Sequence, residues 1–289
     1  MPELPEVETI VRALRSGGLG HESVLGRVIQ RGDLLWERTL AAPNVDEFLF
    51  SLPGQRIHAV ERRGKFLILQ LSDAYLLIHL RMSGDIRVEP AFGPDEKRLA
   101  PAAHDRAVFW FEDGMRMTFN DARKFGRMWL VADPASVVGN LGPEPLSDQF
   151  SADWLYNSLI RRHRQLKPLL LDQSFIAGLG NIYTDEALFL ARLHPLRMSD
   201  QVTQDDAKHL WEAIRTVLEE GIRTHGASID WVYRGGDFQN HFRVYQRTGE
   251  PCRVCGTLIE RRLVGQRGTH YCPVCQSERK TKPAQVEHQ

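Results

Sequence analysis

Four cysteines near the C-terminal end constrain the fold of this chain more than any other feature. They form the pattern C-x2-C-x16-C-x2-C at Cys252, Cys255, Cys272 and Cys275, and they are the only cysteines among the 289 residues. Two CxxC pairs at this spacing are typical of a tetrahedral zinc site with four thiolate ligands. Two disulfides or a redox pair are the alternatives. Closed four-thiolate sites are structural, so we predict a small ribbon folded around one Zn²⁺ that takes no part in catalysis.

Charge is distributed unevenly along the chain, although the formal net charge is zero. Residues 1–135 carry 18 Lys/Arg and 19 Asp/Glu, residues 136–240 carry 10 and 14, and residues 241–289 carry 9 and 4. The C-terminal module is therefore basic, and three arginines in the cysteine spacer could contact phosphates. A zero net charge does not exclude a nucleic-acid partner, because a polyanion responds to the local field.

The composition and the N-terminal sequence favour a globular, cytoplasmic protein. Hydrophobic residues make up 42% of the chain and charged residues 26%, which is ordinary for a globular domain. No apolar run reaches the 18 residues or so of a membrane span, and the first thirty residues lack the layout of a signal peptide. We therefore expect no membrane partner.

Secondary-structure patterns change along the chain. Apolar spacing over residues 7–14 predicts one helix that ends near Gly17. Residues 27–131 contain short β-like segments between turn signals, which predict an antiparallel sandwich or barrel. A Pro/Gly-rich linker at residues 132–146 follows, and beyond it the apolar spacing is helical up to the cysteine module. The last of these helices begins with Thr203 and Asp206 in a capping-box-like arrangement.

The chain opens with MPELPEVETI, which is both a helix start and a candidate reactive group. Proline and acidic residues in a first turn are usual features of a helix start. Methionine before proline is normally removed, which would leave Pro2 as a secondary amine with an ordinary α-amino pKa of about 7.7–8.0. Such an amine can attack a sugar C1′ and form a cationic iminium, and Glu3 is adjacent to move protons.

Three other segments suit contact with nucleic acid. IAGLGNIYTDEAL places a glycine turn before a helix that we expect Asn181 to cap, which makes either an anion site or an ordinary helix corner. FNDARKFGRM places Arg123 and Phe125 at a loop tip, where they could read and wedge a base stack. Met82 lies at a strand end before Ser83-Gly84, where ordinary turn chemistry or core packing is the alternative. Lys65 follows Gly64 at the start of an apolar strand, where a solvated side chain is the alternative. No HExxH motif or nucleophile–histidine pairing is evident.

Together these motifs resemble those of the formamidopyrimidine-DNA glycosylase (Fpg/MutM) family of bacterial base-excision repair. The resemblance runs from PELPEVET through RRGKFL, HLRMSG, NDARKFG and LKPLLLDQSFIAGLGNIYTDEALF to the CxxC ribbon. It implies an α+β multidomain fold in which DNA lies in a cleft between two halves. The implied parts are an N-terminal antiparallel β-sandwich domain (1–134), a helix-two-turns-helix domain (146–240), a four-cysteine zinc finger (241–277) and a flexible tail (278–289).

The resemblance also implies roles for individual residues. Pro2 would be the nucleophile and Glu3 the general acid/base, while Glu6 would help to organise the site. Lys65 would contact phosphate and support catalysis, and Arg267 would bind a phosphate beside the lesion. The other implied DNA contacts, which fill the gap left by the extruded base or bind the backbone, are Met82, His104, Arg123, Phe125, Lys167 and Asn181.

The implied activity is that of a bifunctional DNA glycosylase/AP lyase acting on oxidised purines. It would form a Schiff base through Pro2 and cut double-stranded DNA by β,δ-elimination, as a monomer associated with the bacterial nucleoid. One alternative is an endonuclease VIII-like enzyme for oxidised pyrimidines, since HGASIDWVYRGGDFQNHFRVYQR is shorter than the family's usual segment. The opening PELPEVE argues against this enzyme, because proteins of the endonuclease VIII group open with PEGPE. The second alternative is a non-catalytic, zinc-bearing protein that binds damaged DNA, which would not need Pro2 and Glu3.

Overall fold

The computed structural model describes residues 1–20, 22–228 and 235–278, which fold as two compact units. Unit 1 comprises residues 1–147, 173–179 and 218–241, and unit 2 is the rest of the chain from Asp148. The domain boundaries that the resemblance implies stay predictions. The predicted tail, apart from Glu278, and residues 229–234 of the shortened segment lie outside the described residues.

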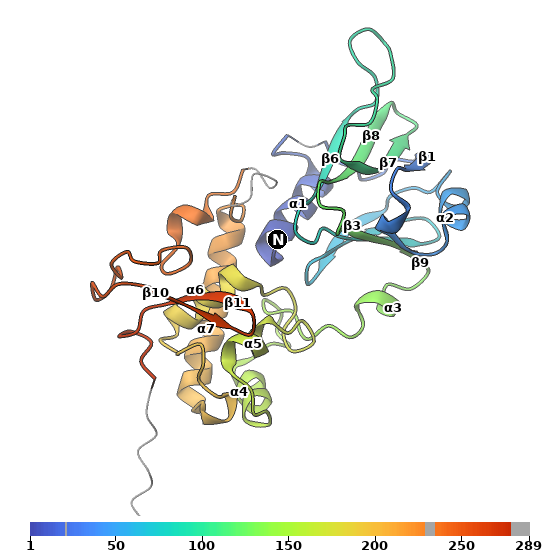
Figure 1. Ribbon diagram of the computed structural model, residues 1–289. Helices are drawn as coiled ribbons and strands as arrows, with labels where there is room; N and C mark the ends of the chain where they lie inside the picture. The colour runs from blue at the N-terminus through green and yellow to red at the C-terminus, as the bar shows by residue number, and fades with distance from the viewer. Residues whose placement is uncertain (21, 229–234, 279–289) are drawn as a thin grey trace, which may run out of the picture. The chain divides into compact units, whose positions relative to one another are not determined.

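Unit 1 is a β-sandwich, so the fold is the first of the two architectures that the sequence pattern allowed (Figure 1). One sheet has the order β1-β7-β8-β6 and the other β2-β9-β5-β4-β3. Buried side chains from both sheets form one apolar core, including Ile78, Phe109 and Met128. The strands are β1 (Ile29–Leu34), β2 (Leu40–Ala42), β3 (Ala59–Arg63), β4 (Phe66–Gln70), β5 (Tyr75–His79), β6 (Gly84–Pro90), β7 (Asp105–Phe111), β8 (Met115–Asp121) and β9 (Arg127–Val131).

Helix α1 (Leu4–Ser16) confirms the helix expected at the start of the chain. Its apolar stripe of Val7, Val11 and Leu14 is fully buried in the sandwich core. The helix ends where predicted, because Gly17 adopts a φ of +77° that a residue with a side chain disfavours. Pro2 and Glu3 precede the helix, so the backbone at the candidate nucleophile is not part of it.

Two short helices of unit 1 were not anticipated. Helix α2 (Val45–Ser51) begins where the Asn44 side chain accepts a hydrogen bond from the Glu47 N–H. Helix α3 (Ala135–Val138) lies within the predicted linker. The described residues also form short 3-10 helices, η1 (Glu37–Thr39) and η3 (Phe238–His241) in unit 1 and η2 (Ser199–Gln201) in unit 2.

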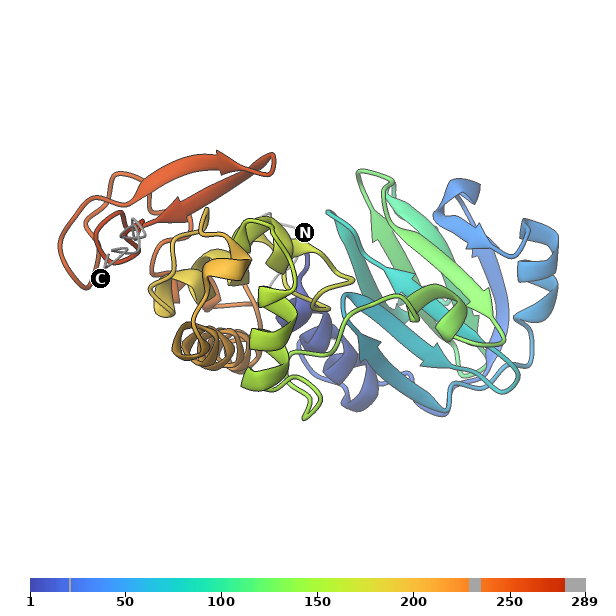
Figure 2. The same ribbon diagram turned by 90° about the horizontal axis from the view of Figure 1, so that it is seen from below.

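Unit 2 combines helices with a two-stranded hairpin (Figure 2). Its helices are α4 (Ala152–Ile160), α5 (Leu166–Leu171), α6 (Asn181–Leu190) and most of α7 (Gln204–Arg223), and the hairpin is β10 (Glu260–Val264) with β11 (Arg267–Tyr271). Thr203 and Asp206 exchange hydrogen bonds across the first turn of α7, which confirms the predicted capping arrangement. The buried Glu186 carboxylate accepts the N–H groups of residues 243–245 and so joins α6 to the ribbon segment. No helix within the described ranges is long and apolar enough to cross a membrane.

Candidate functional site

One carboxylate fixes the backbone near the start of the chain. Pro2 and Glu3 are both buried in front of α1. Glu6 uses its two oxygens on different segments of unit 1: Oε2 accepts the Glu3 N–H at 2.8 Å, and Oε1 accepts the Ala227 N–H at 2.8 Å. Glu6 therefore fixes the backbone next to Pro2 relative to the loop that follows α7.

Two glycines allow loops of unit 1 to approach this end of α1. Gly178 has a φ of +88°, and a Cβ built there would lie 2.7 Å from Leu4 Cδ1. Its carbonyl accepts the Leu4 N–H at 3.1 Å. Gly226 has a φ of +81°, and its Cβ would lie 2.6 Å from Glu6 Oε1. A side chain at either position would displace the start of the helix.

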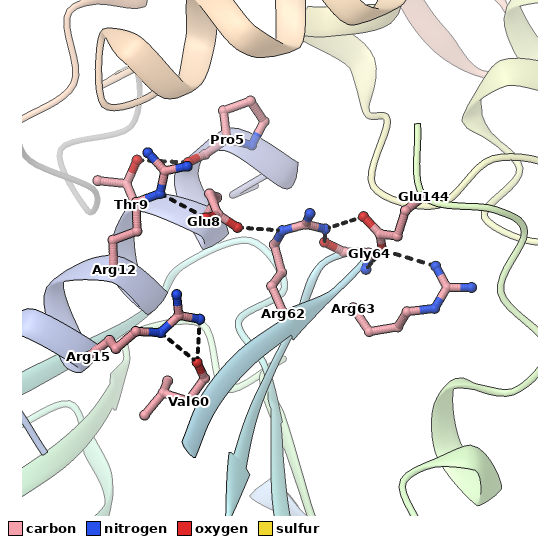
Figure 3. Close-up of polar contacts among 10 residues, drawn as sticks. All are labelled: Pro5, Glu8, Thr9, Arg12, Arg15, Val60, Arg62, Arg63, Gly64 and Glu144. Carbon is pink, nitrogen blue, oxygen red and sulfur yellow. Dashed lines mark hydrogen bonds and ion pairs between the residues drawn. The ribbon is translucent and has the colours of Figure 1, made fainter. Parts of the chain in front are cut away.

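Lys65 lies in the turn between β3 and β4, directly after Gly64, whose N–H and carbonyl both form hydrogen bonds. Glu144 Oε1 accepts the Gly64 N–H at 2.5 Å, and Arg62 Nη1 donates to the Gly64 carbonyl at 3.0 Å (Figure 3). Arg62 also donates to Glu144 Oε2 at 2.7 Å and to Glu8 Oε2 at 3.1 Å. Arg62 thus connects α1 with the turn that carries Lys65.

Glu8 forms the helical end of this connection. Burial alone would raise the pKa of Glu8, but hydrogen bonds and positive charge from Arg12 and Arg62 outweigh burial and hold its pKa below the ordinary value of 4.5. Its carboxylate is therefore ionised at neutral pH. Arg63 adds a second ion pair to Glu144 at 2.9 Å, so both guanidinium groups preceding Gly64 bind one carboxylate.

His79, which the sequence analysis missed, is a neighbour of Lys65 at the end of β5. Burial, with the positive charges of Arg81 and Lys65, lowers the pKa of His79 to about 3, so the ring is neutral at pH 7. Its Nδ1 accepts the Arg81 N–H at 3.0 Å, which places the ring proton on Nε2 as a donor. A polar residue at the end of the apolar run YLLI was the available sequence signal.

Met82, Arg123 and Phe125 come together at one end of the β6–β8 pair. Gly84 of β6 pairs in register with Asp121 of β8, so the two loops that carry these residues leave the sheet as neighbours. Arg123 Nη1 lies 3.7 Å from Met82 Sδ, and the Met82 and Phe125 side chains are 38% and 55% exposed. Exposed apolar side chains beside a guanidinium suit insertion into a base stack.

His104 lies beside the same loops. It is exposed directly before β7, and its carbonyl accepts the Asp121 N–H at 2.8 Å. Unit 1 therefore contains the predicted reactive residues at the start of α1, Lys65 between β3 and β4, and the predicted base-contacting residues at one sheet end.

In unit 2, three predicted site residues meet around one carbonyl group. Asn181 Nδ2 and Lys167 Nζ donate to the Gly268 carbonyl at 3.0 and 3.3 Å, next to the exposed Arg267. The expectation that Asn181 caps α6 is wrong by one residue. Gly180 occupies the cap and Asn181 is the first helical residue, because its amide group binds the hairpin instead of its own helix.

Lys167, which the resemblance implies as a DNA contact, is a buried residue. Its side chain and that of Asp185 are both fully buried, and the two form an ion pair. Asp185 Oδ2 also accepts the His270 N–H at 2.9 Å, and it lies 3.1 Å from the ring nitrogen of that residue. Lys167 therefore connects α5, α6 and β11.

The four cysteine sulfurs gather in unit 2 with all their separations within 4.8 Å. Cys252 and Cys275 have sulfurs 3.9 Å apart, and those of Cys255 and Cys272 are 3.5 Å apart. Tetrahedral zinc with Zn–S bonds of about 2.3 Å needs sulfurs about 3.8 Å apart, whereas a disulfide needs about 2.0 Å. The residues fit the predicted zinc ion, and the disulfide alternative is excluded.

Three family models match successive parts of the chain. Residues 1–128 match the formamidopyrimidine-DNA glycosylase N-terminal domain, residues 141–232 match the formamidopyrimidine-DNA glycosylase H2TH domain, and residues 249–277 match the zinc finger found in FPG and IleRS.

Curated relatives and solved structures match over nearly the same length. The formamidopyrimidine-DNA glycosylases of Protochlamydia amoebophila and Heliobacterium modesticaldum are 42% and 44% identical, over 96% of this chain and 100% of each relative. Wild-type Lactococcus lactis Fpg (MutM) bound to N7-benzyl-Fapy-dG containing DNA has a TM-score of 0.86 at 34% identity. MutM in complex with carbocyclic 8-oxo-G containing DNA gives the same two values. Both alignments cover 96% of this chain and 100% of the other.

Proposed function

The chain belongs to the formamidopyrimidine-DNA glycosylase family, and we propose that it excises oxidised purines from double-stranded DNA and cleaves the resulting abasic site. It is a base-excision repair glycosylase with one structural zinc. The choice of 8-oxoguanine and formamidopyrimidines is supported by the solved relatives, which are bound to DNA containing 8-oxo-G and Fapy-dG. The observation that carries the proposal is the burial of Pro2 and Glu3 ahead of α1, where Glu6 anchors the backbone beside Pro2.

The reaction begins at Pro2 after removal of Met1. The proline nitrogen bonds to C1′ as the bond from C1′ to the damaged base breaks, and the base leaves with a proton. Glu3 protonates the ring oxygen, which opens the sugar and gives a cationic iminium. The iminium withdraws electrons, so a C2′ proton is lost and the 3′ phosphate leaves. A second elimination expels the 5′ phosphate, and water releases the sugar fragment from Pro2.

The remaining residues hold the DNA. Lys65 and the Nε2–H of His79 supply donors for phosphate from unit 1, while Asn181 and Arg267 supply donors from unit 2. Lys167 acts indirectly, because it holds the Gly268 carbonyl next to Arg267. Extrusion of the damaged nucleotide costs a few kcal/mol of unstacking. The residues that fill the resulting gap or bind the complementary strand are Met82, His104, Arg123 and Phe125.

Borohydride trapping tests this proposal directly. The protein with a free Pro2 should form a covalent complex with duplexes that contain 8-oxoguanine opposite cytosine. A Pro2→Gly variant and a form with an N-terminal extension should trap far less. Undiminished trapping with the extension would refute the Pro2 assignment. A duplex with an oxidised pyrimidine tests the alternative substrate in the same gel.

The protein acts as a monomer in the cytoplasm and reaches the nucleoid through its affinity for DNA. Light scattering should give the mass of one 33.0 kDa chain. A concentration-independent dimer mass would contradict this part of the proposal.

A further inference from the structure

We propose that Asp121 is a positioning residue that sets the geometry of the Met82 and Arg123–Phe125 loops. Under the proposed function on which this inference rests, Arg123 faces the base opposite the lesion and Phe125 wedges the stack. Asp121 would then govern both base extrusion and discrimination of the opposite base, without touching DNA.

The Asp121 carboxylate binds both loops at once. It is 1% exposed and ends β8. Its Oδ1 accepts the Ser83 hydroxyl and, at 3.2 Å, the Arg123 N–H, while its Oδ2 accepts the Gly126 N–H at 2.7 Å. The Ser83 Oγ accepts the Arg123 N–H as well, at 3.1 Å. One carboxylate therefore joins both ends of the loop that carries Phe125 to the loop that carries Met82.

The backbone of Asp121 is fixed too. Its carbonyl accepts the Arg106 Nε–H at 2.7 Å, and its N–H donates to the His104 carbonyl at 2.8 Å. Arg106 is buried, so this support does not depend on solvent. The position of the carboxylate is therefore set by the sheet and not by the two loops that it binds.

Both loops also rest on the same aromatic ring. A Cβ built on Gly126 would lie 2.3 Å from Phe119 Cζ, and one built on Gly84 would lie 2.9 Å from Phe119 Cε2. The two glycines therefore allow the loops to pack onto Phe119 with no side chain between. Because the loops share this support, a shift of one loop alters the packing of the other.

The tips of the loops need such anchors, because their backbone is strained. Arg81 and Lys124 have φ values of +55° and +60°, a left-handed conformation that residues with side chains adopt at a cost. From outside, Trp36 adds support, since the Lys124 ammonium lies 4.0 Å from the centre of its ring. The conformation that presents Arg123 and Phe125 is thus maintained by contacts rather than by local preference.

The Asp121→Asn variant tests the proposal because it keeps the size of the side chain and removes one acceptor. The new NH₂ group would face either the Gly126 N–H or the donors Ser83 and Arg123, so one end of the loop loses its anchor. Asp46→Asn is the matched control, because Asp46 is exposed on α2. Ser83→Ala is the second variant, and it removes only the hydroxyl that bridges the loops.

Three substrates separate positioning from general destabilisation: 8-oxoguanine opposite cytosine, 8-oxoguanine opposite adenine, and a preformed abasic site. We expect Asp121→Asn to lower base excision opposite cytosine by about tenfold or more, since small misplacements cost this much in rate. The cytosine-to-adenine ratio should shrink, while cleavage at the abasic site changes much less, because elimination depends on Pro2 and Glu3. Failure of the wild-type protein on all three would refute the proposed function, not the role of Asp121.

A 2-aminopurine base beside the lesion reports the wedge. Its fluorescence rises when the stack opens, and at saturating protein the rise should be smaller for Asp121→Asn and for Ser83→Ala than for Asp46→Asn. If a thermal melt shows that Asp121→Asn is unfolded, the same measurements on Ser83→Ala test the proposal. The proposal is overturned if the folded variant matches wild type. It is also overturned if excision and abasic-site cleavage fall in parallel with an unchanged opposite-base ratio and fluorescence rise.

Discussion

Replacement of Arg62 by methionine should weaken both the fold of unit 1 and the trapping reaction. Arg62 is the residue through which Glu8 of α1 is joined to Glu144 and to the Gly64 peptide before Lys65. Methionine retains much of the aliphatic packing and removes every hydrogen bond. We expect α1, which directly follows the proposed nucleophile Pro2, and the β3–β4 turn to lose their fixed relation.

The expected magnitude follows from the burial and partners of the network. The Arg62 side chain is 10% exposed, and its two carboxylate partners are 18% and 21% exposed. Hydrogen bonds to charged groups contribute about 1.5–3 kcal/mol when buried, and exposed ion pairs at most about 1 kcal/mol. Glu8 keeps Arg12 and Glu144 keeps Arg63, so neither carboxylate is left alone. The free energy of unfolding should therefore fall by about 2–3 kcal/mol.

Urea denaturation and hydrogen exchange of the β3–β4 amides would measure this loss. Arg12→Met is the matched control: it removes the other partner of Glu8 at a side chain that is 60% exposed, and it should cost about 0.5 kcal/mol. Arg62→Lys keeps the charge without the forked geometry and should give an intermediate loss. If Arg62→Met cost no more than Arg12→Met, the network would not stabilise the turn.

The stability difference between wild type and the Arg62 variant should also depend on pH. Because the folded pKa of Glu8 is depressed, its stabilising contribution is present above the ordinary value of 4.5 and is lost as pH falls through the lower folded value. The difference in the free energy of unfolding between wild type and Arg62→Met should therefore become smaller at low pH.

Three other substitutions test separate parts of the site. The pKa of His79 is about 3 in the folded protein against 6.5 ordinarily, so stability should fall by about 2 kcal/mol between pH 7 and pH 5 in urea denaturation, and His79→Gln should reduce that slope. Gly178→Ala should cost about 2 kcal/mol and slow trapping, because its Cβ meets Leu4, whereas Gly114→Ala, with a similar φ and open space, should cost only about 1 kcal/mol. Chelation of the zinc, or Arg267→Ala, should weaken DNA binding while the circular dichroism of the sandwich persists; for Arg267→Ala the slope of log K against log salt should drop by about one. Unchanged affinity would contradict the last prediction.

Features set by neighbouring residues could be predicted from the sequence. The end of α1 at Gly17 follows from local backbone preference, and the cysteine quartet from ligand spacing. The Thr203–Asp206 cap also depends on residues three apart. The residues that determine the helix end and the cap lie within a few positions of them. The four cysteines can be assigned because few metal ions and geometries suit four thiolates.

Features that depend on distant segments could not be predicted. The Arg62–Glu144 ion pair joins residues 82 positions apart, and nothing local marks either as a partner. Asn181 does not cap α6 because Gly268, 87 positions away, binds its amide. Lys167 was implied as a DNA contact by the resemblance, and its complete burial depends on Asp185, which lies 18 positions away. Tertiary contacts override local preference at these positions.

The Gly268 carbonyl, which receives both Asn181 and Lys167, has a thermodynamic consequence. These two hydrogen bonds lead us to expect that the zinc-ordered hairpin and the start of α6 behave as one cooperative element. If Asn181 and Arg267 bind DNA as proposed, zinc and DNA are then linked ligands. Linkage is reciprocal: the factor by which zinc tightens DNA binding equals the factor by which DNA tightens zinc binding. Duplex DNA should therefore slow the loss of zinc to a chelator, and an enzyme engaged on a lesion would be the form most resistant to metal depletion.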